Sequence, residues 1–323
     1  ILELAIGIYG LILPLLIIAC KPVYAILYNQ LYSHFMIYNI ITFLGCAIIL
    51  CIPVICMGAT LPILCRFYVT SLSHLGTHTG RLYGLNTIGA AAGSVLCGFW
   101  LINLLGIWGT LVFGVLINCA IGVFCIAAGG RLKQVRGHTV TSAAGSFGPA
   151  VPGEDKSEQG PGILYGALVV FAVSGFCSMA YEVFWAKLLG LIVGPTTYSF
   201  TIVLVTFILG LALGSILFGW LADRYGKTIW LLLSTQVVAA LFVLGISQLL
   251  GNSQFFFAKL IFYFQDQFAL RSIIKGLVLF FMMVVPTLCL GATFPLVGMI
   301  YTRSVAKVGG SIGFAYAINT VGA

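Results

Sequence analysis

Long apolar runs recur along this chain, and their length is the first guide to its structure. Each is about as long as the roughly 20 residues that a helix needs to cross a bilayer. Backbone groups in lipid must bond within their own segment, and barrel strands would alternate over about ten residues, so the runs predict helices. We therefore expect an all-α, polytopic membrane protein, with the lipid bilayer as its main partner. The runs cover residues 2–19, 36–68, 82–104, 107–129, 163–186, 197–222, 228–250 and 274–301, and a further one begins near 312.

One polar stretch divides these runs into two groups. Residues 131–162 are rich in Gly, Ser, Pro and charge, in contrast to the apolar sequence on both sides. Such a composition predicts a solvated, flexible linker. The sequence thus predicts a first membrane half at 1–130, the linker, and a second membrane half at 163–323.

The two halves share an internal repeat. A shift of 233 positions aligns residues 53–90 with 286–323 without a gap, and fifteen of the 38 positions are identical. The second copy begins six predicted spans after the first, an even number, so both copies cross the membrane in the same direction. This is the parallel relation found between the halves of major facilitator transporters. We expect two parallel repeats of about six spans each, of which about nine spans are present because the chain is truncated at both ends.

Composition agrees with a membrane protein and argues against nucleic-acid binding. Hydrophobic residues make up 61% of the chain and charged residues 7%, whereas soluble domains carry roughly 25% charged residues. The net charge is +8, but no basic run is interleaved with aromatic residues as single-strand binding requires. Basic residues of membrane proteins instead collect in cytoplasmic loops. We expect a multi-pass protein of the plasma or inner membrane, with the linker 131–162 on the cytoplasmic side.

Residues for metal binding or covalent chemistry are scarce. The ten cysteines lie in apolar segments without a C-x-x-C pair and are interpreted as small buried hydrophobes. His74 and His78 have a spacing that suits a metal on a helix, but no acidic or cysteine ligand accompanies them. There is no Gly-rich nucleotide motif, and no acidic pair occurs outside the linker. The sequence predicts no metal, no cofactor and no catalytic residue.

Each repeat copy carries the same proline motif inside a long apolar run. Proline removes a backbone hydrogen bond, so the helix is expected to kink or break there. Freed carbonyls of a broken helix would line a substrate cavity. Alternatively, the motif is a packing kink relieved by threonine hydroxyls. The motif residues are Pro53, Gly58, Thr60 and Pro62 in the first copy, and Pro286, Gly291, Thr293 and Pro295 in the second.

The stretch "SMAYEVFWAKLLG" holds the most unusual side chain of the membrane runs, Glu182. A carboxylate at membrane depth costs a few kcal/mol, so it should face protein or water and is a candidate for function. Tyr181, Trp185 and Tyr198 would form an aromatic wall suited to binding a cation. Alternatively, Glu182 lies near the membrane surface, with Trp185 and Lys187 as interfacial anchors.

Further polar residues predict contacts between helices or between loops. Asn86 and Asn319 occupy matching positions of the two copies, and each needs a hydrogen-bond partner in lipid, from another helix or from a ligand. The short turn 219–227, "GWLADRYGK", carries Asp223 and Arg224. We expect this turn to be cytoplasmic, with Asp223 capping the next helix or pairing with a basic residue.

Two pairs of glycines predict close helix packing. Gly89 and Gly93 have G-x-x-x-G spacing, and Gly210 and Gly214 have the same spacing in the second half. Small residues at this spacing let two helix backbones approach each other. Both pairs are therefore expected to lie at helix–helix contacts.

With these residues in view, the chain resembles the membrane portion of the fused spermidine synthase-like (polyamine aminopropyltransferase-like) family. The resemblance covers essentially the whole chain and rests on four motifs: "SGFCSMAYEVFWAKLLGLIVGPTTYSF", "FILGLALGSILFGWLADR", "MGATLPIL" and "GRLYGLNTIGAAAGSVLCGFWLINLLGIWGT". It implies a major-facilitator-like membrane region followed by a soluble domain that transfers an aminopropyl group to putrescine. Such a domain needs a Gly-rich nucleotide site, which this chain lacks, so it would have to follow Ala323.

Three functional interpretations follow. The first is a non-catalytic membrane domain associated with polyamine biosynthesis or with the handling of a polyamine or related cation, which Glu182 contacts. The second is a major-facilitator-type secondary transporter of an unrelated small solute. The third is a structural anchor that holds a fused enzyme at the membrane.

Overall fold

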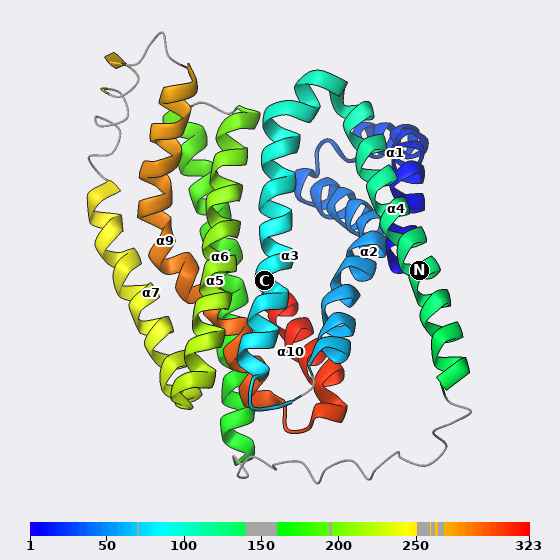
Figure 1. Ribbon diagram of the computed structural model, residues 1–323. Helices are drawn as coiled ribbons and strands as arrows, with labels where there is room; N and C mark the ends of the chain where they lie inside the picture. The colour runs from blue at the N-terminus through cyan, green and yellow to red at the C-terminus, as the bar shows by residue number, and fades with distance from the viewer. Residues whose placement is uncertain (70, 140–159, 194–195, 251–258, 260–261, 264–267) are drawn as a thin grey trace. The chain divides into compact units, whose positions relative to one another are not determined.

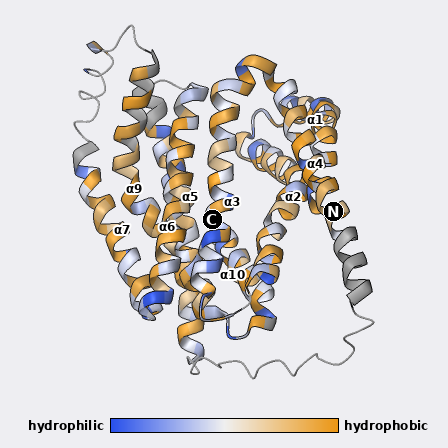
Figure 2. Cartoon of the chain, in the orientation of Figure 1, coloured by the Kyte–Doolittle hydropathy of each residue, from blue (hydrophilic) through white to orange (hydrophobic). Residues whose placement is uncertain are grey.

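The chain is helical throughout the part that the structure describes, with no strand among those residues (Figure 1). Seven helical stretches are long and apolar enough to cross a membrane. Their surfaces are hydrophobic along most of their length (Figure 2). An all-α chain with membrane-spanning helices is therefore confirmed. The computed structural model describes residues 1–69, 71–139, 160–193, 196–250, 259, 262–263 and 268–323.

Each predicted apolar run up to 274–301 lies on a helix, but several helices are longer than their runs: α1 continues to Leu31, beyond the predicted end at 19, and α3 begins at Leu75, before the predicted start at 82. The predicted run 36–68 is the helix α2, which begins at Phe35 and ends at Tyr68. α4 continues beyond its predicted end into the linker, and the linker residues 140–159 lie outside the described residues. The helices are α1 Leu2–Leu31, α2 Phe35–Tyr68, α3 Leu75–Leu96, α4 Ile102–Thr139, α5 Pro161–Val193, α6 Thr197–Tyr225, α7 Thr228–Leu250, α9 Phe268–Tyr301 and α10 Val308–Gly322, with short turns η1 Cys97–Leu101 and η2 Val305–Lys307.

A glycine separates α3 from most of α4. Gly106 has a φ of 67°, in the left-handed region that glycine enters without steric cost. The backbone leaves the helical conformation at this residue, inside the long helical stretch Leu75–Gly129. The interruption falls between the two apolar runs that the sequence separates, 82–104 and 107–129.

The chain forms two compact units whose bounds differ from the predicted halves. Unit 1 comprises Ile1–Thr60 and Leu104–Pro152, and unit 2 comprises Leu61–Asn103 and Gly153–Ala323. Unit 2 contains α3, which packs against α6 and α9 of the second half. The first-half helix α3 thus belongs to the same compact body as the helices after the linker.

Unit 1 is held together where α1 meets α4 at small residues. A Cβ added at Gly7 would lie 2.9 Å from Cys119 Sγ, and one added at Gly122 would meet the side chain of Leu4. The Tyr9 hydroxyl also donates a hydrogen bond of 2.6 Å to the carbonyl oxygen of Ile49 in α2. These contacts stay within the unit, and its helices carry few buried side chains.

In unit 2, α3 approaches α6 through a row of glycines spaced four residues apart, Gly76, Gly80 and Gly84. A Cβ added at Gly80 would meet the backbone oxygen of Ser215, whose hydroxyl donates a hydrogen bond of 3.2 Å to the Gly80 carbonyl. The predicted pair Gly89 and Gly93 has no atom within 4 Å of an added Cβ. The close contact of α3 therefore uses a different glycine row from the one expected.

The predicted glycine pair of α6 does form a close contact, with α9. A Cβ added at Gly210 would meet the side chain of Thr287, and one added at Gly214 would meet the backbone of Leu288. In return, a Cβ added at Gly291 would meet the backbone of Leu211. Gly291 of the proline motif is thus a packing residue, and α9 is the centre of unit 2, with every side chain buried from residue 289 to 300.

The proline motif does not break a helix. α9 is helical through both Pro286 and Pro295, and it bends part of the way along its length (Figure 1). Thr293 Oγ1 donates a hydrogen bond of 2.6 Å to the Leu290 carbonyl. In unit 1 the equivalent Thr60 donates one of 2.7 Å to the Met57 carbonyl. Of the two alternatives, the structure agrees with a bend inside a continuous helix. The two hydroxyls do not bond to the carbonyls of Gly291 and Gly58, which lose their helical partners at Pro295 and Pro62.

We expect Gly80→Val to destabilise the folded protein by about 1–3 kcal/mol, because the new side chain would be forced into the backbone of α6. Gly89→Val makes the same chemical change on the same helix where no neighbour lies within 4 Å, and it serves as the control. Thermal unfolding of both variants in detergent, followed by size-exclusion chromatography, measures the difference. Equal melting temperatures for the two variants would contradict the α3–α6 contact.

Candidate functional site

Two faces of α5 carry the polar and aromatic side chains from which a site can be built. In a helix, residues four apart lie on the same face. Cys177, Tyr181 and Trp185 form one such row, and Ser174, Ser178 and Glu182 form the adjacent row. The two rows face different neighbours, so they are described in turn.

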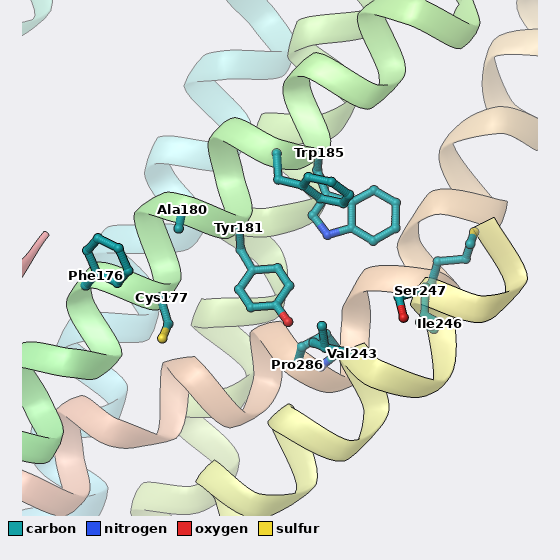
Figure 3. Close-up of a pocket in the computed structure, with 11 residues that line it drawn as sticks. Phe176, Cys177, Ala180, Tyr181, Trp185, Val243, Ile246, Ser247 and Pro286 are labelled. Carbon is teal, nitrogen blue, oxygen red and sulfur yellow. The ribbon is translucent and has the colours of Figure 1, made fainter. Parts of the chain in front are cut away.

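The aromatic row of α5 lines an apolar cavity of about 330 Å³. Figure 3 shows Tyr181 and Trp185 extending from α5 toward Pro286 of α9 and Val243 of α7. Three residues that the sequence marks as functional, Tyr181, Trp185 and Pro286, therefore line one cavity. Ser247 of α7 contributes a hydroxyl to a lining that is otherwise almost wholly apolar.

Trp185 also has a structural role beside this cavity. Only 4% of its surface is exposed, and it packs in a cluster with Val203 and Phe207 of α6 and Met283 of α9. Tyr181 packs against the edge of this cluster and is half-buried. Of the two aromatic residues, Tyr181 therefore has the freer ring.

The serine row of α5 faces a second, smaller cavity of about 40 Å³ with a polar lining. Ser174 Oγ lies 3.5 Å from Thr293 Oγ1, so α5 and α9 meet here through hydroxyl groups. The polar side chains of the lining come from four helices and converge on a membrane-spanning region that is otherwise apolar. They are Tyr83 of α3, Ser174 and Ser178 of α5, Thr293 of α9, and Tyr316 and Asn319 of α10.

Aromatic rings close one side of this polar cavity. Tyr83 stacks on Phe294 with ring centroids 4.6 Å apart, and Tyr316 meets the same ring edge-on at 5.8 Å. Tyr83 and Tyr316 are related by the offset of 233 that aligns the two repeat copies. Equivalent tyrosines of the two copies thus lie on the same phenylalanine and line the same cavity.

Asn319 joins α10 to α5 beside this cavity. Its side-chain amide donates a hydrogen bond of 2.8 Å to the Phe171 carbonyl, and a Cβ added at Gly175 would meet the Asn319 backbone. This is the interhelical bond that the sequence allows for an asparagine in lipid. Its repeat equivalent, Asn86, lies exposed on α3 and is not brought to the cavity.

Glu182 lies one helical turn beyond Ser178 on the same row of α5. Its side chain is half-buried. Within the described part of the chain it takes part in no hydrogen bond or ion pair. The Glu182 carboxylate continues the polar row of Ser174 and Ser178. The preceding residue, Tyr181, belongs to the other row, which lines the apolar cavity.

Tyr198, the third member of the expected aromatic wall, lies elsewhere. Its hydroxyl accepts a hydrogen bond of 2.8 Å from Asn103 Nδ2, and its ring centroid is 5.3 Å from that of Phe99. These contacts hold the start of α6 against the end of η1 and the residues that follow it. Tyr198 is not among the residues that line either cavity.

Asp223 in the α6–α7 turn caps α3, a helix that precedes it by almost half the chain. Oδ1 accepts a hydrogen bond of 3.0 Å from the Gly76 amide, and Oδ2 accepts one of 2.6 Å from the Thr77 amide. These amides belong to the first turn of α3, where N–H groups lack helical partners and the helix dipole favours negative charge. The cap is therefore on α3, whereas the sequence suggested the following helix α7.

Two other residues of this turn, Gly226 and Arg224, make contacts with α6 itself. Gly226 has a φ of 67° and ends α6, with its amide bonded to the Ala222 carbonyl. The guanidinium of Arg224 lies 5.2 Å from the centre of the Trp220 ring. Arg224 thus makes an exposed cation–π contact within its own helix.

The two histidines of the sequence analysis pack as rings. The His78 ring lies 5.1 Å from that of Tyr68 and 6.2 Å from that of His74. Across the described residues, no group of three or more His, Cys, Asp or Glu side chains could hold a metal ion.

Sequence reasoning missed four residues of the polar cavity: Ser174, Ser178, Tyr83 and Tyr316. Two signals were present in the sequence. The serines precede Glu182 at intervals of four residues, and the tyrosines occupy identical positions in the two aligned copies. Neither signal identifies the cavity unless it is known which helix faces pack against each other.

Comparisons with known proteins leave the family open. No protein-family model, no curated protein and no solved structure matches the chain. The functional argument therefore depends on the residues of this chain alone.

We expect Asp223→Ala to destabilise unit 2 by about 1–2 kcal/mol, because it removes the only side chain that accepts from the first amides of α3 in the described residues. Asp223→Asn keeps one acceptor oxygen and should cost less. Arg224→Ala, which removes an exposed contact in the same turn, is the control. Thermal unfolding in detergent ranks the variants, and an unchanged melting temperature for Asp223→Ala would refute the cap.

Proposed function

We propose that this chain is a membrane transport domain that binds a small organic cation of the polyamine class at Glu182. The observation that carries the proposal is the row Ser174, Ser178 and Glu182 on α5. The two serines line the polar cavity of unit 2, and Glu182 lies one helical turn further along α5, outside the lining. A half-buried carboxylate without an ion-pair partner among the described residues can bind a cationic solute. Its hydroxyl neighbours offer acceptors for ammonium groups.

The cost of an acidic side chain in a membrane span supports a functional role. Even lenient scales assign a few kcal/mol to a carboxylate at the centre of a spanning helix. The helix α5 is otherwise apolar at this depth and would be more stable with an apolar residue at 182. Binding a cation at this carboxylate provides a reason for it.

The repeat supports a transporter of the major facilitator type. α2 ends at Tyr68 and α9 at Tyr301, and α3 begins at Leu75 and α10 at Val308. Both pairs differ by 233, the offset that aligns the two sequence copies. We infer two parallel repeats, with the linker 131–162 on the cytoplasmic side of the plasma or inner membrane by the excess of basic residues there.

The Asp223 cap favours a second candidate, a major-facilitator-type carrier of an unrelated small solute. It connects the α6–α7 turn to α3 through two short hydrogen bonds, and such a contact can break and re-form between two states of a carrier. This candidate shares the architecture with the first and differs in the solute. It needs no role for Glu182 in binding a polyamine.

An association with polyamine biosynthesis is the least direct part of the proposal. It rests on the four motifs that resemble the spermidine synthase-like family, two of which contain functional residues described above. "SGFCSMAYEVFWAKLLGLIVGPTTYSF" contains Ser174, Ser178 and Glu182, and "FILGLALGSILFGWLADR" contains Asp223. Any aminopropyl transfer would belong to a soluble domain fused to this chain.

We expect Glu182→Gln to lower spermidine uptake into proteoliposomes about tenfold or more, because it removes the charge that pairs with the substrate ammonium. Glu3→Gln makes the same change at the other glutamate of a spanning helix, in unit 1, and is the control. Uptake of labelled spermidine at low concentration is the measurement. The melting temperature of each variant shows whether the fold is intact.

Other results would decide between the candidates. Spermidine uptake that is unchanged in a folded Glu182→Gln protein would reject Glu182 as the cation contact. No spermidine uptake by the wild-type chain, together with counterflow of another solute in a metabolite panel, would favour the second candidate.

A further inference from the structure

A third cavity of unit 2 combines basic and apolar residues and is larger than the other two. Its volume is about 900 Å³. It lies where α5 begins, beside the loop that joins α9 to α10, and both lie at the same end of unit 2 (Figure 1). The proposed transport site does not use it. The lining consists of Pro161, Leu164, Tyr165, Leu168, Val169, Ala172, Tyr301, Arg303, Ser304, Lys307, Ser311, Phe314 and Ile318.

One end of this cavity is suited to an anion. Arg303 and Lys307 are exposed, and Ser304 and Ser311 add hydroxyl groups to the same lining. Among the described residues, no acidic side chain belongs to the lining. α10 begins at Val308, directly after Lys307, so the positive end of its helix dipole lies at the same place.

The wall along α10 becomes apolar with distance from these cations, and the wall along α5 is apolar along its whole length apart from the Tyr165 hydroxyl. On α10 the lining passes from Lys307 and Ser311 to Phe314 and then Ile318. On α5 it passes from Pro161, at the helix start, to Leu168, which is 7% exposed. The polar part therefore lies at the end of the spans, and the apolar part runs along them.

The Phe314 ring is fixed in this wall by a second aromatic residue. It stacks on Tyr301 with centroids 5.8 Å apart and planes 22° apart, and it remains 49% exposed. Tyr165, on α5, is 71% exposed in the same lining. The cavity thus offers exposed aromatic surface between a basic end and an aliphatic wall.

We propose that this cavity binds an anionic phospholipid. The phosphate is held by Lys307, Arg303 and the start of α10, and an acyl chain lies along Leu168 and Phe314. Basic pockets between membrane helices bind anionic headgroups, and each Lys or Arg near the surface contributes to the attraction. A soluble phosphate compound shares the headgroup chemistry but would leave the apolar walls of the cavity uncovered.

Native mass spectrometry of the full chain in detergent tests the proposal, with phosphatidylglycerol and phosphatidylcholine titrated separately. We expect phosphatidylglycerol to bind more tightly, and Lys307→Gln to weaken it about fivefold. Lys307→Arg should keep the affinity because it keeps the charge. Lys227→Gln, which neutralises an exposed lysine outside the cavity, is the matched control and should have no effect.

Four results would overturn the proposal. Equal affinity for the two lipids would remove the basis for an anionic site, as would an unchanged affinity in Lys307→Gln. Full displacement of the lipid by glycerol phosphate, which has no acyl chain, would show a phosphate site without a lipid. Lipid binding that is absent in the wild-type chain and appears only after Glu154, Asp155 and Glu158 of the linker are all changed to glutamine would show that the linker, and not a lipid, is the occupant.

Discussion

The close approach of α6 to both α3 and α9 is the contact on which the rest of unit 2 depends. Water is absent from the bilayer core, so helices there gain little from burying apolar surface and associate through tight packing instead. Gly80 and Ser215 bring α3 to α6, while Gly214 and Gly291 bring α6 to α9. This packing buries α9 and sets the positions of Thr293 and Pro286, which line the polar and the apolar cavity respectively.

The same packing explains why polar residues gather where they do. Buried hydroxyl groups in lipid need partners, and several bond to carbonyls of their own helix, as Thr287 and Thr293 do. Ser174, Asn319 and Asp223 instead reach other helices. Glu182 is the acidic member of α5 whose surroundings in the described residues supply no such partner, and this sets it apart from a structural polar group.

Much of the architecture could be predicted from the sequence because spanning helices are encoded locally. Run length alone gave helix ends such as Tyr68 and Tyr301, and the glycine pair at 210 and 214 correctly indicated a packing face. Helix continuity at Pro286 and Pro295 was one of two alternatives that the sequence left open, since the choice depends on how the surrounding helices pack against the weakened backbone. The sequence also did not show which row of α5 faces which cavity, because residue spacing identifies a helix face but not the helix that packs against it. For the same reason Asn86 and Asn319, equivalent in sequence, differ in exposure and partners.

The Asp223 contact has an evolutionary consequence. Both of its acceptors bind backbone amides, so the side chain at position 77 contributes nothing to the bond, and any residue there except proline can preserve it. A contact of this kind leaves no paired substitutions between positions 223 and 77. Position 76 differs, because a Cβ added there would lie 2.9 Å from Asp223 Oδ1, so the contact between segments nearly 150 residues apart requires glycine at 76 together with the acid at 223.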